Sequence, residues 1–168
     1  GTFTEVTEKA GLSDTRWSLQ ASWLDYDRDG YLDVFVSNYL QYDDGKFRSF
    51  YPAAGYPGPL SYNGVSNALY HNNKDGTFTD VTKAAGVFNP GGRTMSSVAA
   101  DLNNDGWMDI YVANDSMENY YYENKGDGTF AEKGVGLFLA FGQNGQGVSS
   151  MGPAVADLDA DGNLDIMI

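Results

Sequence analysis

Three copies of one acidic nine-residue pattern, at residues 25–33, 101–109 and 157–165, constrain this chain more than any other feature. Each copy has an oxygen-bearing side chain at positions 1, 3, 5 and 9 and glycine at position 6. Calcium prefers oxygen ligands, and glycine allows the sharp turn that gathers them around one ion. With a backbone carbonyl from position 7, each copy predicts a calcium loop. The predicted side-chain ligands are Asp25, Asp27, Asp29 and Asp33, then Asp101, Asn103, Asp105 and Asp109, then Asp157, Asp159, Asp161 and Asp165.

The loops differ from EF-hands, because Val36, Val112 and Ile168 stand where an EF-hand has its glutamate at position 12. These residues lie in apolar runs rich in β-branched and aromatic side chains, so each loop is expected to join two strands. The alternative is that the acidic segments are plain solvated turns. Carboxylates packed this densely repel one another unless a cation neutralises them, which favours calcium. Asn103 replaces a carboxylate, so we expect the second loop to bind more weakly.

A second repeated element predicts the architecture. Gly-Thr-Phe segments begin at residues 1, 76 and 128, in phase with the acidic loops, and residues 67–72 and 119–124 read as further strands. Each repeat thus supplies four short strands, which is typical of β-propeller blades that bury their faces against neighbouring blades. We therefore predict an all-β fold, a propeller-like array of four-stranded antiparallel blades, with a β-sandwich or β-solenoid as the alternative. The expected division is the last strand of an incomplete blade at 1–12, a blade at 13–87 with an aromatic insertion at 38–66, a second blade at 88–136 and the first half of a third at 137–168.

The combination of the acidic loop, an Asn-x-Leu-Tyr-x-Asn strand at 67–72 and a GTFxDVTxxAG segment at 76–86 resembles the FG-GAP or VCBS repeats of integrin α-subunit propellers. It is most similar to the CRTAC1/ASPIC-UnbV group of secreted and bacterial proteins. The resemblance implies a calcium-bearing propeller, usually of seven blades, in proteins of adhesion, cell-surface or matrix type. It carries the family's metal ligands onto the side chains named above and its backbone ligand onto Tyr31, Trp107 and Asn163.

The composition limits which partners and which cellular location we expect for the protein. The formal net charge is −13 and the 10 Lys and Arg form no cluster, so we expect no nucleic-acid partner. No apolar run is long enough to span a membrane. Eleven of the 23 acidic residues lie in the three loops, so about three bound Ca²⁺ would offset much of the charge. Cysteine is absent, which leaves calcium as the expected stabiliser and favours an extracellular, cell-surface or periplasmic location.

The insertion at 38–66 is too aromatic for a disordered linker. Its tyrosines and phenylalanines could form a recognition surface for a protein or carbohydrate ligand, since tyrosine offers an apolar face with a polar tip. The alternative is that the insertion folds over the blade edge as structural cover. The aromatic residues concerned are Tyr39, Tyr42, Phe47, Phe50, Tyr51, Tyr56 and Tyr62, interspersed with Pro52, Pro57 and Pro59.

From these expectations we predict that the protein is a calcium-stabilised extracellular or cell-surface scaffold with a binding or structural function. A closed propeller needs at least about four blades, so the array is expected either to belong to a longer protein or to be completed head to tail by neighbouring chains in a fibre. A catalytic propeller, a hydrolase or lyase, is the third alternative. We do not expect an enzyme, because the single histidine, His71, lies in a strand repeat at the position that Tyr122 approaches.

Overall fold

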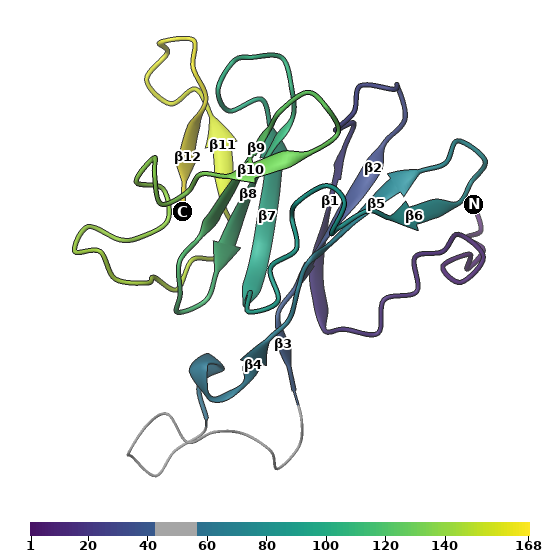
Figure 1. The fold of residues 1–168 in the computed structure, drawn as a ribbon, viewed down its shortest axis with the longest axis horizontal. Helices are drawn as coiled ribbons and strands as arrows, with labels where there is room; N and C mark the ends of the chain where they lie inside the picture. The colour runs from purple at the N-terminus through teal and green to yellow at the C-terminus, as the bar shows by residue number, and fades with distance from the viewer. Residues whose placement is uncertain (43–56) are drawn as a thin grey trace.

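The computed structural model describes residues 1–42 and 57–168 and confirms the predicted all-β class. Two four-stranded antiparallel sheets stand side by side, followed by a two-stranded sheet near the C-terminus (Figure 1). Among the described residues the only helical element is one 3-10 turn, η1 (Pro59–Ser61), and no α-helix is present. No helix in this part of the chain is therefore long and apolar enough to cross a membrane.

The first sheet has the order β1-β2-β5-β6. Its strands are β1 (Ser18–Leu24), β2 (Asp33–Asn38), β5 (Ala68–Asn72) and β6 (Phe78–Asp80). The central strand β2 is almost completely buried, as expected for its apolar sequence Val34-Phe35-Val36. Val34 pairs with Tyr70 and Phe35 with Leu69, which fixes the register between β2 and β5.

The second sheet repeats this arrangement, with β7 (Thr94–Ala100), β8 (Asp109–Asn114), β9 (Tyr120–Asn124) and β10 (Phe130–Glu132). Ile110 pairs with Tyr122 and Tyr111 with Tyr121. Each sheet is one blade of a propeller-like array. This register also corrects one expectation, because it makes Glu123, and not Tyr122, the counterpart of His71.

The third unit is shorter than its sequence suggests. Within residues 137–168, expected as the first half of a third blade, the strands are β11 (Ala154–Ala156) and its partner β12 (Asp165–Met167), while Val148 forms an isolated bridge with Met117. We expected the last strand of an incomplete blade within residues 1–12, but these residues form no strand. A strand needs hydrogen-bonded partners, and no described segment pairs with them, so Phe3 is left fully exposed.

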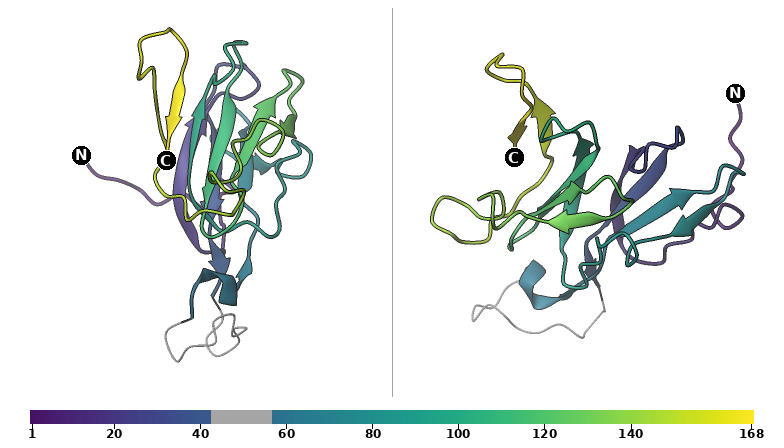
Figure 2. Two further views of the ribbon diagram at one scale, coloured as in Figure 1. Left: turned by 90° about the vertical axis from the view of Figure 1, so that its left-hand side faces the viewer. Right: turned by 45° about the horizontal axis from the view of Figure 1, so that its top comes forward.

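The main core lies between the two four-stranded sheets. Its buried side chains come from both sheets, from the segment that links them and, for Tyr26, from the first acidic loop: Leu24, Tyr26, Phe35, Leu69, Ala85, Val87, Ile110, Val112, Tyr122 and Phe130. Strand β1 packs beside β7, and β7 in turn contacts β11, so the first strands of successive units are neighbours (Figure 2). Face-to-face burial between blades therefore holds the array together.

Asparagine side chains add polar links between the units. Asn67 accepts a hydrogen bond from the Asn38 N–H and donates one to Thr94 Oγ1 in the next blade, at 2.8 and 2.9 Å. Its counterpart Asn119 accepts from the Asn114 N–H and donates to Ser150 Oγ, both at 2.8 Å. All of these groups are buried, so each asparagine satisfies polar atoms on two successive units.

A short ribbon carries the aromatic insertion away from the first blade. It consists of β3 (Leu40–Gln41) and β4 (Asn63–Gly64), and it lies at the end of the sheets opposite the acidic loops (Figure 1). Of the residues predicted for a recognition surface, Tyr39, Tyr42, Pro57, Pro59 and Tyr62 are described. The others, Phe47, Phe50, Tyr51, Pro52 and Tyr56, lie outside the described residues.

Candidate metal centres

The three acidic loops occupy equivalent places in the fold. They connect β1 to β2, β7 to β8 and β11 to β12, and all three lie at the same end of the sheets (Figure 1). Neighbouring loops touch. The Arg28 guanidinium of the first loop stacks over the Trp107 ring of the second at 5.0 Å, and Asn104 of the second donates a 2.8 Å hydrogen bond to Asn163 of the third.

One hydrogen-bond network folds all three loops. The backbone N–H of position 5 donates to the side-chain oxygen of position 1 at 3.0, 3.0 and 3.1 Å in the three copies. The N–H of position 6 donates to the other oxygen of position 1, and the N–H of position 7 to the carboxylate of position 5. The glycine at position 6 has a φ of 86° to 90° in each copy, a conformation that a side chain would strain.

Position 9 fastens each loop to its sheet. Asp33, Asp109 and Asp165 each accept a hydrogen bond from the backbone N–H of position 2, at 3.2, 3.2 and 2.9 Å. Asp33 and Asp109 are fully buried and also accept from Asn72 and Asn124 N–H of the third strand, both at 2.8 Å. Burial raises the pKa of both carboxyl groups, because desolvation disfavours their charged forms. A bound cation would offset that penalty.

Side-chain oxygens converge in two of the loops as a calcium ion requires. Ligand atoms of Asp25, Asp27 and Asp29 lie within 4.8 Å of one another, and so do those of Asp157, Asp159 and Asp165. In the second loop, Asn103 donates a 2.9 Å hydrogen bond to Asp105, so a neutral amide stands beside this carboxylate where the other two loops have a second carboxylate. Oxygen donors of this number and spacing fit a hard divalent cation. The side chains of Tyr31 and Trp107 lie outside these clusters, and only their backbones could contribute ligands.

Comparison with protein families decides the identity of the repeats. Residues 54–112 and 101–168 match the model of the FG-GAP-like repeat, which together cover more than half of the chain. The chain belongs to the FG-GAP-like repeat family. A search of curated proteins found no match, and the family match does not extend to the finer CRTAC1/ASPIC-UnbV grouping. FG-GAP-like repeats support a scaffold built from propeller-like blades, for binding or for structure.

The FG-GAP-like architecture also brings a residue to the first loop that the sequence patterns missed. His71 Nδ1, on β5, lies 3.3 Å from Asp27 Oδ2 and 3.2 Å from Asp33 Oδ1. His71 directly precedes Asn72, whose backbone N–H binds the position 9 carboxylate, and this contact is visible only in the folded structure. Its position was misassigned by one residue, and the side chain was therefore interpreted as an ordinary strand residue.

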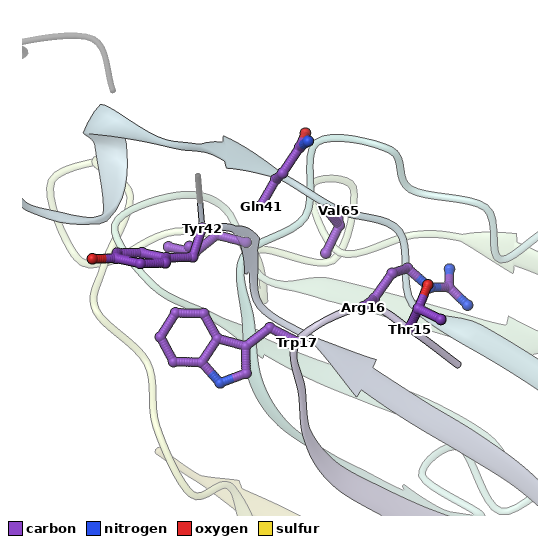
Figure 3. Close-up of a pocket in the computed structure, with 7 residues that line it drawn as sticks. Thr15, Arg16, Trp17, Gln41, Tyr42 and Val65 are labelled. Carbon is purple, nitrogen blue, oxygen red and sulfur yellow. The ribbon is translucent and has the colours of Figure 1, made fainter. Parts of the chain in front are cut away.

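A separate pocket of about 520 Å³ lies where the insertion ribbon meets the start of β1. It is lined by Thr15, Arg16, Trp17, Leu40, Gln41, Tyr42 and Val65. The Trp17 and Tyr42 rings lie next to each other on one side of it, with Thr15 and Arg16 towards the other (Figure 3). Their ring centroids are 6.0 Å apart, and 47% and 60% of these two side chains are exposed. This end of the molecule thus combines accessible aromatic faces with polar neighbours.

Proposed function

We propose that the protein is a calcium-stabilised scaffold of FG-GAP-like blades, working outside the cytosol in adhesion or in a matrix, as proteins of the CRTAC1/ASPIC-UnbV group do. The observation that carries the proposal is the identical hydrogen-bond network of the three loops, with carboxylate oxygens gathered within 4.8 Å of one another in the first and third. Asp25, Asp27, Asp29 and Asp33, with the Tyr31 carbonyl, hold the first ion. The second and third loops use Asp101, Asn103, Asp105, Asp109 and Trp107, and Asp157, Asp159, Asp161, Asp165 and Asn163.

Calcium in this role links the loop to the strand pair that it connects. The position 9 aspartate is bonded both to the loop backbone and to the third strand, so an ion held by it resists separation of three strands. An ion that binds only the folded state stabilises that state by linkage, by about 2.7 kcal/mol at 100 times its Kd. We propose no catalytic role for His71, whose Nδ1 faces the loop carboxylates instead of a substrate pocket.

Thermal unfolding with and without calcium tests the proposal. EDTA is expected to lower the Tm by about 5–10 °C for each site emptied. Equilibrium dialysis should give about three Ca²⁺ per chain. Asp29→Ala should remove one of them, whereas Asp127→Asn, in an exposed turn outside the loops, serves as the matched control and should remove none. Equal melting curves in EDTA and calcium would contradict a structural role for the ion.

The pocket beside the insertion favours a carbohydrate as the ligand of the scaffold. Exposed Trp17 and Tyr42 faces suit the apolar faces of sugar rings, and Thr15 and Gln41 supply hydrogen-bonding groups at the rim. Glycan-array binding that is lost in Trp17→Ala and kept in Tyr31→Ala, an exposed aromatic at the opposite end, would support this ligand. If Trp17→Ala lost binding to a protein partner and the wild-type protein bound no glycan, the ligand would be a protein instead.

A further inference from the structure

His71 differs from every other side chain around the acidic loops, because it brings an imidazole nitrogen to carboxylate ligands. Its Nδ1 atom exposes less than 1 Å² to solvent and has no hydrogen-bond partner, although it lies 3.3 Å from Asp27 and 3.2 Å from Asp33. The side chain as a whole is 27% exposed, and its ring also packs edge-on against Tyr26. A buried nitrogen without a partner needs an explanation.

A direct ion pair explains this geometry poorly. A protonated imidazole would point its N–H at a carboxylate oxygen, yet neither contact has the alignment of a hydrogen bond. A neutral imidazole protonated at Nε2 presents a lone pair at Nδ1, and two carboxylates facing that lone pair repel it unless a cation lies between them. The three side chains each offer a ligand atom, and these atoms lie within 4.8 Å of one another.

The distances fit a particular class of ion. Zinc binds nitrogen and oxygen ligands at about 2.0 Å, and the edges of a tetrahedron of that size measure roughly 3.3 Å. The two contacts of Nδ1, 3.3 and 3.2 Å, match this edge. Calcium takes oxygen ligands, whereas imidazole suits zinc and other divalent transition ions.

We propose that His71, Asp27 and Asp33 form a site for a divalent transition ion such as Zn²⁺ within the first loop, with the fourth position open to water or to another ligand. Among the described residues, His71 is the one basic side chain that contacts Asp27 or Asp33, while Lys74 pairs with Asp29 at 3.1 Å. Zinc would compete with calcium for Asp27 and Asp33, so the first loop can respond to a second metal.

The second blade shows that the site is a property of the first loop and not of the repeat. Glu123, the counterpart of His71, pairs with Lys133, which directly follows β10. The counterpart of Asp27 is Asn103, which is a weaker metal ligand than a carboxylate. The second loop therefore lacks the nitrogen and one carboxylate of the proposed set.

Zinc binding to the whole chain tests the proposal, with zinc chloride titrated into EDTA-treated, dialysed protein by calorimetry. We expect one zinc ion per chain to bind more tightly than any zinc bound weakly at the surface. His71→Gln should weaken it at least about tenfold, and the matched variant Glu123→Gln should leave it unchanged. Wild-type zinc affinity in His71→Gln would overturn the proposal.

A spectroscopic measurement keeps the test independent of variant folding. X-ray absorption of wild-type protein loaded with one equivalent of zinc should show one imidazole among the first ligands, and a first shell of oxygen alone would overturn the proposal. The inference deepens the proposed metal-binding function but fails separately from it. Calcium stoichiometry, measured on the same samples, stays at wild-type level in His71→Gln if the calcium loops are as proposed.

Discussion

The first and second acidic loops have the same backbone and different neighbours. In both, position 9 is fully buried and accepts hydrogen bonds from position 2 and from the third strand of its sheet. In the second loop Tyr121 Oη also donates to Asp109 at 2.8 Å, whereas the counterpart of Tyr121 in the first blade is Leu69. The repeat thus specifies the frame of each loop, while single residues on the third strand determine how its charge is compensated.

This difference has an energetic consequence. Asp109 keeps three protein donors whether or not an ion is present, and Asn103 lowers the charge of its loop. Asp33 has two backbone donors, and its loop carries four carboxylates. We therefore expect the first loop to depend on a bound cation and the second to be stabilised mainly by the protein itself.

Alanine substitution of the position 9 aspartates is the strongest way to break this comparison. In EDTA, Asp109→Ala should lower the free energy of unfolding by about 3 kcal/mol or more, because it leaves three buried or partly buried donors without an acceptor. Asp33→Ala should have a smaller effect in EDTA and a larger additional effect in calcium. Urea denaturation under both conditions measures the difference.

The critical result is which of these two variants loses more unfolding free energy in EDTA. If Asp33→Ala destabilises the protein more than Asp109→Ala in EDTA, the second loop does not owe its stability to protein donors. The exposed aspartate variant Asp127→Asn should change little under either condition and controls for the loss of one charge.

Giving the second loop a fourth carboxylate should make its calcium affinity more similar to that of the first loop. Asn103→Asp is expected to increase calcium affinity about tenfold, or about 1.4 kcal/mol, because affinity in such loops rises with ligand charge. In EDTA the same variant should be slightly less stable, since it replaces the Asn103–Asp105 hydrogen bond with repulsion. Calorimetric titration with calcium measures the change.

The matched control is Asn104→Asp, which adds the same charge one residue further along. Position 4 has a φ of 59° and its side chain bonds to Asn163 of the next loop, so it contributes no ligand to its own centre. An equal gain from both variants would mean that net charge, and not coordination, sets the affinity.

Sequence patterns predicted the frame of this molecule well, for a physical reason. Loop ligands, turn glycines and strand alternation are local features, and three repeats of them specify four-stranded units without knowledge of distant contacts. The contacts of His71 and Tyr121 could not be predicted in the same way. They depend on which residue of the third strand lies next to position 9, and a shift of one residue in the register changes that neighbour.

The links between blades were equally hidden from the sequence. Asn67 and Asn119 were predicted only as the first residues of strands, yet each bridges two units through buried hydrogen bonds. The strand expected within residues 1–12 did not form, for the converse reason. Its Gly-Thr-Phe sequence matches the strands β6 and β10, but strand formation depends on a partner and not on the sequence alone.

The smallest expected effect extends the comparison to the opposite end of the two blades. Asn38 donates to Asp14 at 3.1 Å and to the Ser66 carbonyl at 3.0 Å, while its counterpart Asn114 donates to the Glu118 carbonyl, the equivalent of Ser66, at 2.7 Å. Burial opposes ionisation of Asp14, but the hydrogen bonds and charge of Arg16 hold its pKa below the usual range. A lowered pKa in the folded state gives stability that is present above the unfolded pKa of about 3.9 and is lost as pH falls through the folded value.

Asp14→Asn should therefore lower the free energy of unfolding by about 1 kcal/mol at pH 7, and the difference from wild type should shrink as the pH falls below about 3.9 towards 3. Urea denaturation at both pH values in EDTA measures it, with Glu8→Gln as a surface control for the lost charge. A difference that persists at pH 3 would assign the effect to packing of the new side chain. A difference that vanishes would show that the first blade is tied to ionised carboxylates at both of its ends. At the end opposite the loops, the two blades share the asparagine-to-carbonyl bond, and Asp14 adds a carboxylate acceptor in the first.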